Sequence, residues 1–281
     1  PLVASSLGTL RSYALAPRQD NVMVSVAERL HTCMPDESSF NAGSSKLCIL
    51  VLPGGGYCDV EGTLGYEGIR VAEWFCSRGL LAFALQYTLG PFGWHGRAAS
   101  VGPAVEDGIA ALSAIRARAK ESGYIGHGQS VNICILGFSA GAHLAMCICR
   151  EAAEKGEQGP EAAILAYPPA RSPNCPCIIG SLIFFPKLID RVMPWGRLCS
   201  ESGHRWCDMD QMAHYMPPTL LVASLRDRLL PPAKHSDKLA AALTRQGVSV
   251  TYLCQDFGWH GFALNGWKDQ CESWLHGKFQ C

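Results

Sequence analysis

Short apolar runs alternate along most of the chain with longer stretches that have the periodicity of helices. Each short run is bounded by glycine, proline or polar residues, which is typical of buried strands. We predict strands in NVMVSVAERL, KLCILVLP, LLAFALQYTL, VNICILGF, EAAILAYP, TLLVASL and VSVTYLCQD. We predict helices in YEGIRVAEWFCSRG, PAVEDGIAALSAIRARAKESG, SAGAHLAMCICREAAEKG, PPAKHSDKLAAALTRQG and GFALNGWKDQCESWLHGKFQ.

Several of the strand-like runs are apolar at nearly every position rather than at alternate positions. CILVL and ICILGF, for example, contain no charged or amide residue. Strands of this kind are buried on both faces, as in a parallel sheet that is covered by helices on both sides. Strands and helices that alternate in this order form a doubly wound α/β architecture. We therefore predict a single α/β domain over residues 1–281 with a doubly wound, mostly parallel sheet.

The second predicted helix has readable boundaries. Pro103 suits the first helical turn, and Gly123 suits the residue just past the end. Glu106 and Asp107 lie close to the start, where the positive end of the helix dipole favours carboxylates.

One segment, from Pro169 to Met216, breaks the alternation of strands and helices. It is irregular and rich in cysteine, proline and aromatic residues. It lies between EAAILAYP and TLLVASL, which we number as the sixth and seventh strands. Because long loops in compact domains are usually functional, we predict that residues 169–216 form a short insert that acts as a partial lid.

The composition narrows the class of protein. The chain has 281 residues, of which 48% are hydrophobic and 17% charged, and it has 24 basic and 24 acidic residues. This balance gives neither a basic surface for nucleic acid nor an acidic tail. No run approaches the roughly 18 apolar residues of a membrane span. We expect a globular protein with no nucleic-acid partner and no membrane span, and we leave its oligomeric state open.

The fourteen cysteines bear on where the protein works. Several lie inside apolar runs, where reduced thiols behave as small hydrophobic groups: Cys48, Cys134, Cys147 and Cys149. The chain has no Asn-x-Ser/Thr sequon, and its first twenty residues lack the pattern of a signal peptide. We therefore expect a reducing, cytoplasmic setting. Because the sequence starts at Pro1, we also expect a processed or truncated amino terminus.

The sequence GFSAG, residues 137–141, is the first candidate for chemistry. It follows the strand VNICIL and precedes a helix, which is the context of a G-x-S-x-G nucleophile elbow. A sharp turn there presents Ser139 above the sheet, and the two glycines leave room for close packing. The alternative is a serine that only caps the helix. We prefer the nucleophile because strand and helix are both in place.

PGGGY, residues 53–57, follows the strand KLCILVL. It could be a flexible turn, and a phosphate loop is disfavoured because no G-K-[ST] follows. Glycines also let a backbone pass close to a substrate and present its amides. We predict that Gly55 and Gly56 donate to an oxyanion, together with the residue after the nucleophile, Ala140.

A catalytic serine needs a histidine as base and a carboxylate that orients the histidine. Asp227 follows the strand TLLVASL, and His260 follows the strand VSVTYLCQD. Carboxyl ends of parallel strands meet at one edge of a sheet, so both side chains should approach Ser139 there. Asp256 and Asp208 are weaker candidates, since neither ends a strand between the serine and the histidine.

Two other histidines have simpler interpretations. The pentapeptide FGWHG occurs twice and contains His95 in its first copy and His260 in its second. His95 precedes Ser139 in the chain, and we interpret it as a loop residue without a catalytic task. His143 follows Ser139 by four residues on the predicted helix, so we expect a buried, hydrogen-bonded side chain.

With these residues in place, the chain resembles the α/β-hydrolase superfamily. Within it, the chain is most similar to the small esterases related to bacterial acetyl-xylan esterases and to the hormone-sensitive-lipase group. The resemblance rests on VLPGGGY, YEGIRVAEWFCSRG, ILGFSAGAHLA, PPTLLVASLRDRLLPP and FGWHGF, from about Lys46 to Phe262. It implies the α/β-hydrolase fold, a triad and an oxyanion hole, with these residues: Ser139, Asp227 and His260; Gly55, Gly56 and Ala140.

The chain departs from these relatives at two positions. Pro53 stands where the lipase group often has the histidine of HGGG, and Ala142 replaces the second glycine of the SAGGHLA pattern. Both changes leave the predicted reacting side chains in place. They therefore bear on the subfamily to which the chain is assigned and not on the predicted chemistry.

The insert contains side chains that could bind zinc, namely Cys175, Cys177, Cys199, His204 and Cys207. The spacing NCPC is C-x-C rather than the C-x₂₋₄-C of zinc knuckles. We therefore predict no metal, and the proposed chemistry needs no cofactor.

These observations predict a serine hydrolase that cleaves short-chain carboxylic esters of small molecules through an acyl-enzyme. An arylformamidase-like amide hydrolase and a small serine peptidase are alternatives with the same site. A non-catalytic ligand-binding protein on the same fold is an alternative of another class. Short acyl groups are expected because the insert is too short to build a long acyl tunnel, although it carries the apolar cluster IIGSLIFF with Met193 and Trp195.

Overall fold

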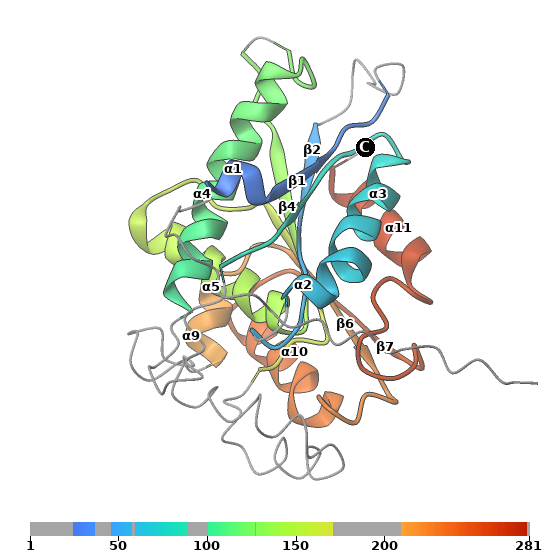
Figure 1. Cartoon of the computed structure of the whole chain (residues 1–281). Helices are drawn as coiled ribbons and strands as arrows, with labels where there is room; N and C mark the ends of the chain where they lie inside the picture. The colour runs from blue at the N-terminus through green and yellow to red at the C-terminus, as the bar shows by residue number, and fades with distance from the viewer. Residues whose placement is uncertain are drawn as a thin grey trace, which may run out of the picture.

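The computed structural model describes residues 25–36, 46–57, 60–88, 101–126, 128–170 and 209–279. Within these ranges, strands form one sheet with helices on both faces (Figure 1). The strands are β1 (Leu30–Cys33), β2 (Leu47–Leu52), β3 (Leu81–Leu85), β4 (Asn132–Phe138), β5 (Ala162–Ala166), β6 (Thr219–Ser224) and β7 (Val250–Gln255). The helical segments are α1 (Val26–Arg29), α2 (Val60–Thr63), the π-helix η2 (Leu64–Ile69), α3 (Arg70–Cys76), α4 (Gly102–Glu121), α5 (Ala140–Lys155), α9 (Met209–His214), the 3₁₀ helix η3 (Pro232–Lys234), α10 (Ser236–Arg245) and α11 (Lys268–Phe279).

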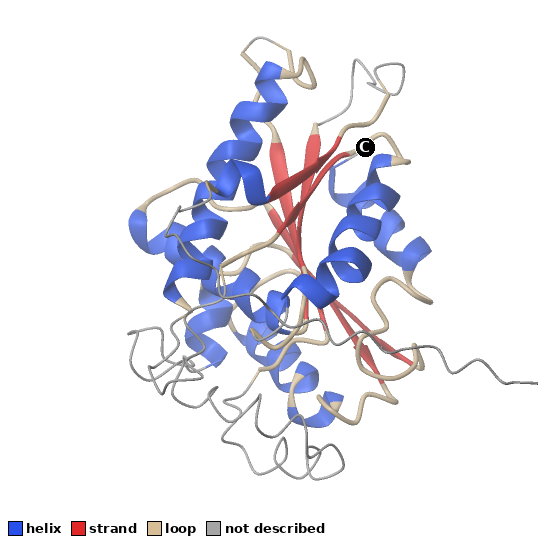
Figure 2. Cartoon of the chain, viewed as in Figure 1, coloured by secondary structure: helices blue, strands red, loops and turns tan. Residues whose placement is uncertain are grey.

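The sheet confirms the predicted doubly wound, mostly parallel architecture. The strand order is β1-β3-β2-β4-β5-β6-β7, with β1 antiparallel to β3 and all other neighbours parallel. Figure 2 shows the strands passing between two layers of helices. Because the strands from β2 to β7 are parallel, the loops that follow β2, β4, β5, β6 and β7 leave from the same edge of the sheet.

Each central strand is apolar throughout because it faces a hydrophobic core on both sides. In β2, Cys48 and Leu50 pack into the core beneath α4, α5 and α10, whereas Ile49 and Val51 pack into the core beneath α3 and α11. All six residues of β2 and all five of β5 are buried. The unbroken apolar runs of the sequence therefore correspond to strands covered on both faces.

The predicted boundaries of α4 are confirmed, but one of its carboxylates has another partner. Pro103 lies in the first turn, and Gly123 follows the helix with a φ of 71°. Asp107 accepts hydrogen bonds from Arg29 at 2.6 and 2.7 Å and from the Thr88 amide at 2.6 Å. Burial disfavours its charge, yet these hydrogen bonds outweigh burial and lower the pKa of Asp107. Asp107 thus ties α4 to the end of α1 and to the loop that follows β3.

The beginning of the predicted sheet needs a correction. We predicted a strand in NVMVSVAERL, but residues 26–29 form the short helix α1 and the strand begins at Leu30. The carboxylate of Glu28 accepts hydrogen bonds from the backbone N–H of Ser25 at 2.9 Å and from its hydroxyl at 3.2 Å. This S-x-x-E capping pattern favours a helical turn over an extended chain.

The predicted insert lies mostly outside the described residues. The described chain ends at residue 170 after β5 and resumes at residue 209 in α9, just before β6. These are the fifth and sixth strands of the described chain, whereas the sequence analysis numbered them sixth and seventh. The partial lid stays a prediction.

Candidate active site

Ser139 lies at the sharp turn between β4 and α5, with φ 50° and ψ −115°. The glycines of GFSAG are required by packing. A Cβ atom on Gly137 would collide with the backbone of Gly141 and Ala142, and one on Gly141 would collide with the carbonyl oxygen of Leu52. The end of β2 therefore passes close to the start of α5, with the strained serine between the two glycines.

The structure brings His260 and Asp227 to Ser139. The Nε2 atom of His260 lies 3.0 Å from Ser139 Oγ, and its Nδ1 atom lies 2.8 Å from Asp227 Oδ2. The other carboxylate oxygen, Asp227 Oδ1, accepts the backbone N–H groups of Leu229 at 3.0 Å and Leu230 at 2.8 Å. The Asp227 side chain is 1% exposed and that of His260 is 20% exposed. Solvent therefore reaches the histidine but not the carboxylate behind it.

Ser224, the last residue of β6, joins the two loops that carry Asp227 and His260. Its hydroxyl donates to the carbonyl oxygen of Gly258 at 2.5 Å and accepts the N–H groups of Phe257 at 3.2 Å and Arg226 at 3.3 Å. These bonds hold the loop after β7 against the loop after β6. Ser224 thus helps to fix the distance between the Asp227 carboxylate and the His260 imidazole.

The glycine-rich loop after β2 is also held in place. The hydroxyl of Tyr87 lies 2.9 Å from the carbonyl oxygens of both Pro53 and Gly54. The N–H of Gly54 donates to Glu67 Oε2 at 2.7 Å. Gly55 and Gly56 then take φ values of 90° and 63°, which glycine adopts readily.

The third predicted oxyanion donor, Ala140, is the first residue of α5 and is fully buried. The first amides of a helix have no partner within the helix, so they are suited to bind an anion. The loop after β2 passes directly beside this helix start, as the contact between Gly141 and Leu52 requires.

Sequence reasoning missed Tyr167, which packs on His260, and Glu67, which contacts Tyr167. The rings of Tyr167 and His260 meet edge to face, with centroids 4.9 Å apart. The Tyr167 hydroxyl donates to Glu67 Oε1 at 2.8 Å. Burial and the nearby Glu67 raise the pKa of Tyr167 well above its ordinary value, so the phenol stays neutral. A glutamate within an apolar helical face was the only sequence signal for this pair.

The other predicted candidates are placed as follows. His143 is buried and its Nδ1 lies 2.8 Å from the Tyr57 hydroxyl, which confirms the expected hydrogen-bonded side chain. Asp256 lies 3.9 Å from Arg226 on the surface. His95 and Asp208 lie outside the described residues.

The described part of the chain contains no group of three or more His, Cys, Asp or Glu side chains that could hold a metal ion. The five side chains weighed as zinc ligands in the insert lie outside the described residues. The eight cysteines that are described are free thiols. Burial raises the pKa of several of these thiols, to about 12 for Cys149.

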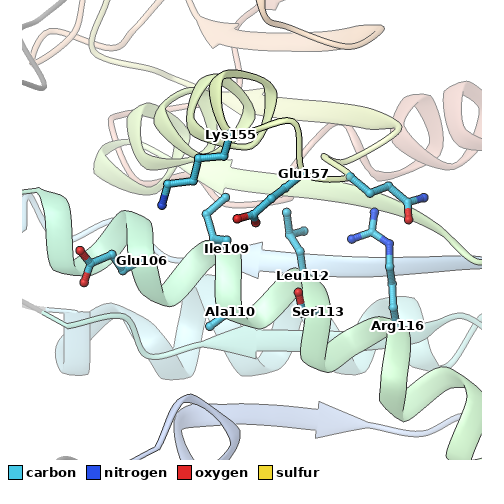
Figure 3. A pocket seen from close by; sticks show the side chains of 9 residues that line it. Glu106, Ile109, Ala110, Leu112, Ser113, Arg116, Lys155 and Glu157 are labelled. Atoms are coloured by element: carbon cyan, nitrogen blue, oxygen red, sulfur yellow. The ribbon is translucent and has the colours of Figure 1, made fainter.

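A surface pocket of about 550 Å³ lies away from these residues, between α4 and α5 (Figure 3). Glu106 and Arg116 lie at its two ends, and Lys155 and Glu157 lie between them. Arg116 also donates to the carbonyl oxygen of Gly159, just before β5 begins. This pocket shares no residue with the site around Ser139.

The fold and the site define a hydrolase architecture, and a comparison with protein families agrees. Residues 98–264, more than half of the chain, match the family model of the alpha/beta hydrolase fold. The chain therefore belongs to the alpha/beta hydrolase fold family.

Solved structures of similar fold include three esterases or ester hydrolases. An acetyl ester-xyloside bifunctional hydrolase from Caldicellulosiruptor lactoaceticus is 22% identical, with a TM-score of 0.62 and 94% of each chain covered. A carboxylesterase from Lactobacillus plantarum is 21% identical, with a TM-score of 0.63, covering 89% of this chain and 91% of that one. A thermostable esterase from Pseudomonas putida is 18% identical, with a TM-score of 0.60, covering 84% of this chain and 71% of that one.

A search of curated protein sequences found no match for the chain. Among the described residues, no helix has the length and apolar character needed to cross a membrane.

Proposed function

We propose that the protein is a serine hydrolase that cleaves short-chain carboxylic esters of small molecules through an acyl-enzyme. The observation that carries this proposal is the continuous hydrogen-bonded chain from Ser139 through His260 to Asp227. A serine within 3.0 Å of an imidazole, which in turn contacts a buried carboxylate, has the geometry of an activated nucleophile.

In the first step, Ser139 Oγ attacks the ester carbonyl and its proton moves to His260 Nε2. Asp227 accepts the Nδ1–H of the histidine, so the lone pair of Nε2 faces the serine. The charge that forms on the imidazole is then balanced by a carboxylate held by two backbone amides.

The electron pair of the carbonyl moves onto its oxygen during the attack. We assign the stabilisation of this oxyanion to the N–H groups of Gly55, Gly56 and Ala140. Removing one such donor typically costs about 2.7–4 kcal/mol in the transition state. When the tetrahedral intermediate collapses, the Nε2 proton passes to the leaving alcohol. A water molecule then repeats the sequence on the acyl-enzyme and releases the acid.

The preference for short acyl groups rests on the length of the insert and on one relative. The segment between β5 and β6 spans residues 169–216, which is small for a separate cap domain. The hydrolase from Caldicellulosiruptor lactoaceticus acts, by its description, on acetyl esters. We extend this substrate class to the present chain as part of the proposal.

The test is labelling with a fluorophosphonate, which reacts covalently with activated serines. The wild-type protein should be labelled and should hydrolyse p-nitrophenyl acetate, whereas Ser139→Ala should do neither, because the attacking oxygen is gone. Ser113→Ala, on the exposed face of α4, is the matched control and should behave as wild type. Absence of labelling of the wild-type protein would favour the non-catalytic binding protein.

A substrate panel separates the hydrolase alternatives that share this site. Acyl esters, acetylated sugars, N-formyl aromatic amines and short peptides should be compared by kcat/KM. Faster turnover of N-formyl amines than of esters would favour the arylformamidase-like reaction, and cleavage of peptides would favour the peptidase.

A further inference from the structure

Glu67 is a second buried carboxylate near Ser139, and the proposed reaction does not use it. It lies in the π-helix η2 and is 5% exposed. Both of its oxygens accept hydrogen bonds: Oε2 from the N–H of Gly54 at 2.7 Å, and Oε1 from the hydroxyl of Tyr167 at 2.8 Å. Burying a carboxylate is costly unless it is hydrogen-bonded. The two hydrogen bonds of Glu67 therefore stabilise its buried side chain, and they show which parts of the site it contacts.

The bond to Gly54 fixes the direction of the backbone in the glycine-rich loop. A trans peptide points its C=O and the following N–H in opposite directions. The Pro53 carbonyl faces Tyr87, and the N–H of the same peptide faces Glu67. The Gly54 carbonyl also faces Tyr87, so the N–H of Gly55 must point away from that tyrosine. Glu67 and Tyr87 together therefore set the orientation of a proposed oxyanion donor.

The close contacts of Gly54 couple the position of the glycine-rich loop to the position of Ser139. A Cβ atom at Gly54 would lie 2.7 Å from Glu67 Oε2, 3.1 Å from the Phe138 carbonyl oxygen and 3.2 Å from Ser139 Cβ. The loop is thus packed between the carboxylate on one side and the nucleophile on the other. A shift of the Gly54 peptide would move the loop against Ser139.

The second hydrogen bond of Glu67 connects it, through Tyr167, to the segment that contains His260. The Tyr167 hydroxyl, which donates to Glu67, accepts the N–H of Ala263 at 3.2 Å, three residues after His260. The Tyr167 ring packs on the His260 ring, and the residue before it, Ala166, accepts the N–H of Ser139 at 3.0 Å. Tyr167 itself has a φ of 41°, which its neighbours must maintain.

We propose that Glu67 is a positioning residue that couples the oxyanion loop to the catalytic histidine. It holds Gly54 with one oxygen and Tyr167 with the other, so both parts of the site share one anchor. A π-helical turn, which is common at functional sites, presents this carboxylate. The inference rests on the proposed ester hydrolysis at Ser139.

The test compares two substitutions of Glu67 with p-nitrophenyl acetate as substrate. Glu67→Met removes both acceptors at similar volume, and we expect kcat to fall about 100-fold with KM changed less than about twofold. Glu67→Gln retains one acceptor oxygen and should recover part of this loss, to within about tenfold of wild type. Such graded rescue reports hydrogen bonding at the loop rather than general damage to the fold.

A second measurement follows the oxyanion directly. Ser139 Oγ adds to the carbonyl carbon of a methyl trifluoromethyl ketone. The electron pair of the carbonyl moves onto its oxygen, and the serine proton moves to His260 Nε2. If Glu67 acts through the oxyanion loop, the affinity for this inhibitor should fall by the same factor as kcat/KM across the variants. A purely structural carboxylate would lower the melting temperature without this correspondence.

Glu161 provides the matched control at the opposite edge of the sheet. Its carboxylate accepts the N–H of Ile133 at 2.6 Å, just as Glu67 accepts that of Gly54. Glu161→Met should lower stability while kcat and inhibitor affinity stay at the wild-type values.

The outcomes distinguish the inference from the function on which it rests. A wild-type protein that neither hydrolyses esters nor reacts with fluorophosphonate would overturn both. An active wild type together with Glu67 variants that keep wild-type kcat and inhibitor affinity would overturn the inference alone. If Glu67→Met fails to fold, Glu67→Gln decides: unchanged kcat and inhibitor affinity would still overturn the positioning role.

Discussion

His260 and His95 share the same pentapeptide, so flanking sequence cannot explain a difference between them. His260 gains its proposed role from its contacts, a serine on one ring nitrogen and a buried carboxylate on the other. His143 instead contacts the Tyr57 hydroxyl through its Nδ1 atom, whereas the imidazole beside Ser139 Oγ is that of His260. At the scale of single residues, the proposed base is therefore distinguished by its contacts rather than by its residue type.

This contrast gives a direct prediction. His260→Ala should lower kcat by roughly 10⁴-fold or more, since the serine loses its base. His95→Ala should change kcat only modestly. Steady-state kinetics on p-nitrophenyl acetate for the two purified variants make the comparison, and the reverse ranking would refute the assignment of His260.

The sharp turn between β4 and α5 depends on close packing with its neighbours. Ser139 has a positive φ, a conformation that costs about 1–3 kcal/mol and persists only when neighbouring elements enforce it. The enforcing elements are the ends of β2 and β5 on either side of β4.

Gly141→Ala tests this packing at the level of elements. The added methyl group would meet the carbonyl oxygens of Leu52 and Pro53, so β2 and α5 must separate. We expect a loss of about 1–3 kcal/mol in the free energy of unfolding, together with lower activity. Gly277→Ala is the control, because the same methyl group meets nothing within 4 Å there. It should be neutral or slightly stabilising in denaturant unfolding, as alanine favours helix.

The strands and helices were predictable wherever the pattern of apolar residues is strong. Six of the seven predicted strands, from KLCILVLP onward, agree with β2 to β7, and the five predicted helices correspond to helical segments. The start of the sheet was mispredicted because VSVAERL contains both an apolar alternation and a capping pattern. The local hydrogen bonds between Ser25 and Glu28 favour a helix at residues 26–29.

The candidate site was only partly predictable for a physical reason. Ser139, Asp227 and His260 stand at strand ends in a fixed chain order, so the sequence points to them directly. Glu67, Tyr87 and Tyr167 make their hydrogen bonds to segments that are distant in the sequence. Glu67 and Tyr167, for example, are 100 positions apart, and no local pattern encodes their contact.

At the scale of the whole molecule, the insert should determine which esters are cleaved. We predict that kcat/KM for p-nitrophenyl esters is highest between acetyl and butyryl. Each methylene that a pocket accommodates adds about 0.8 kcal/mol, or roughly fourfold, and a methylene beyond its end adds nothing or clashes. A maximum at eight carbons or more, or activation at an oil–water interface, would contradict the partial lid over residues 169–216.

The sequence separation within the site has a consequence for how activity is gained during folding. The Ser139–His260 hydrogen bond joins residues 121 positions apart, and the Asp227–His260 bond joins residues 33 apart. Contacts between such distant residues require large loops to close, and they form late because their entropic cost comes before their energetic gain. Asp227 and His260 follow β6 and β7, which lie beyond β5 from β4, so their contacts with Ser139 need all of these strands to be in place. Recovered esterase activity during refolding should therefore lag behind recovered helical circular dichroism and report completion of the sheet.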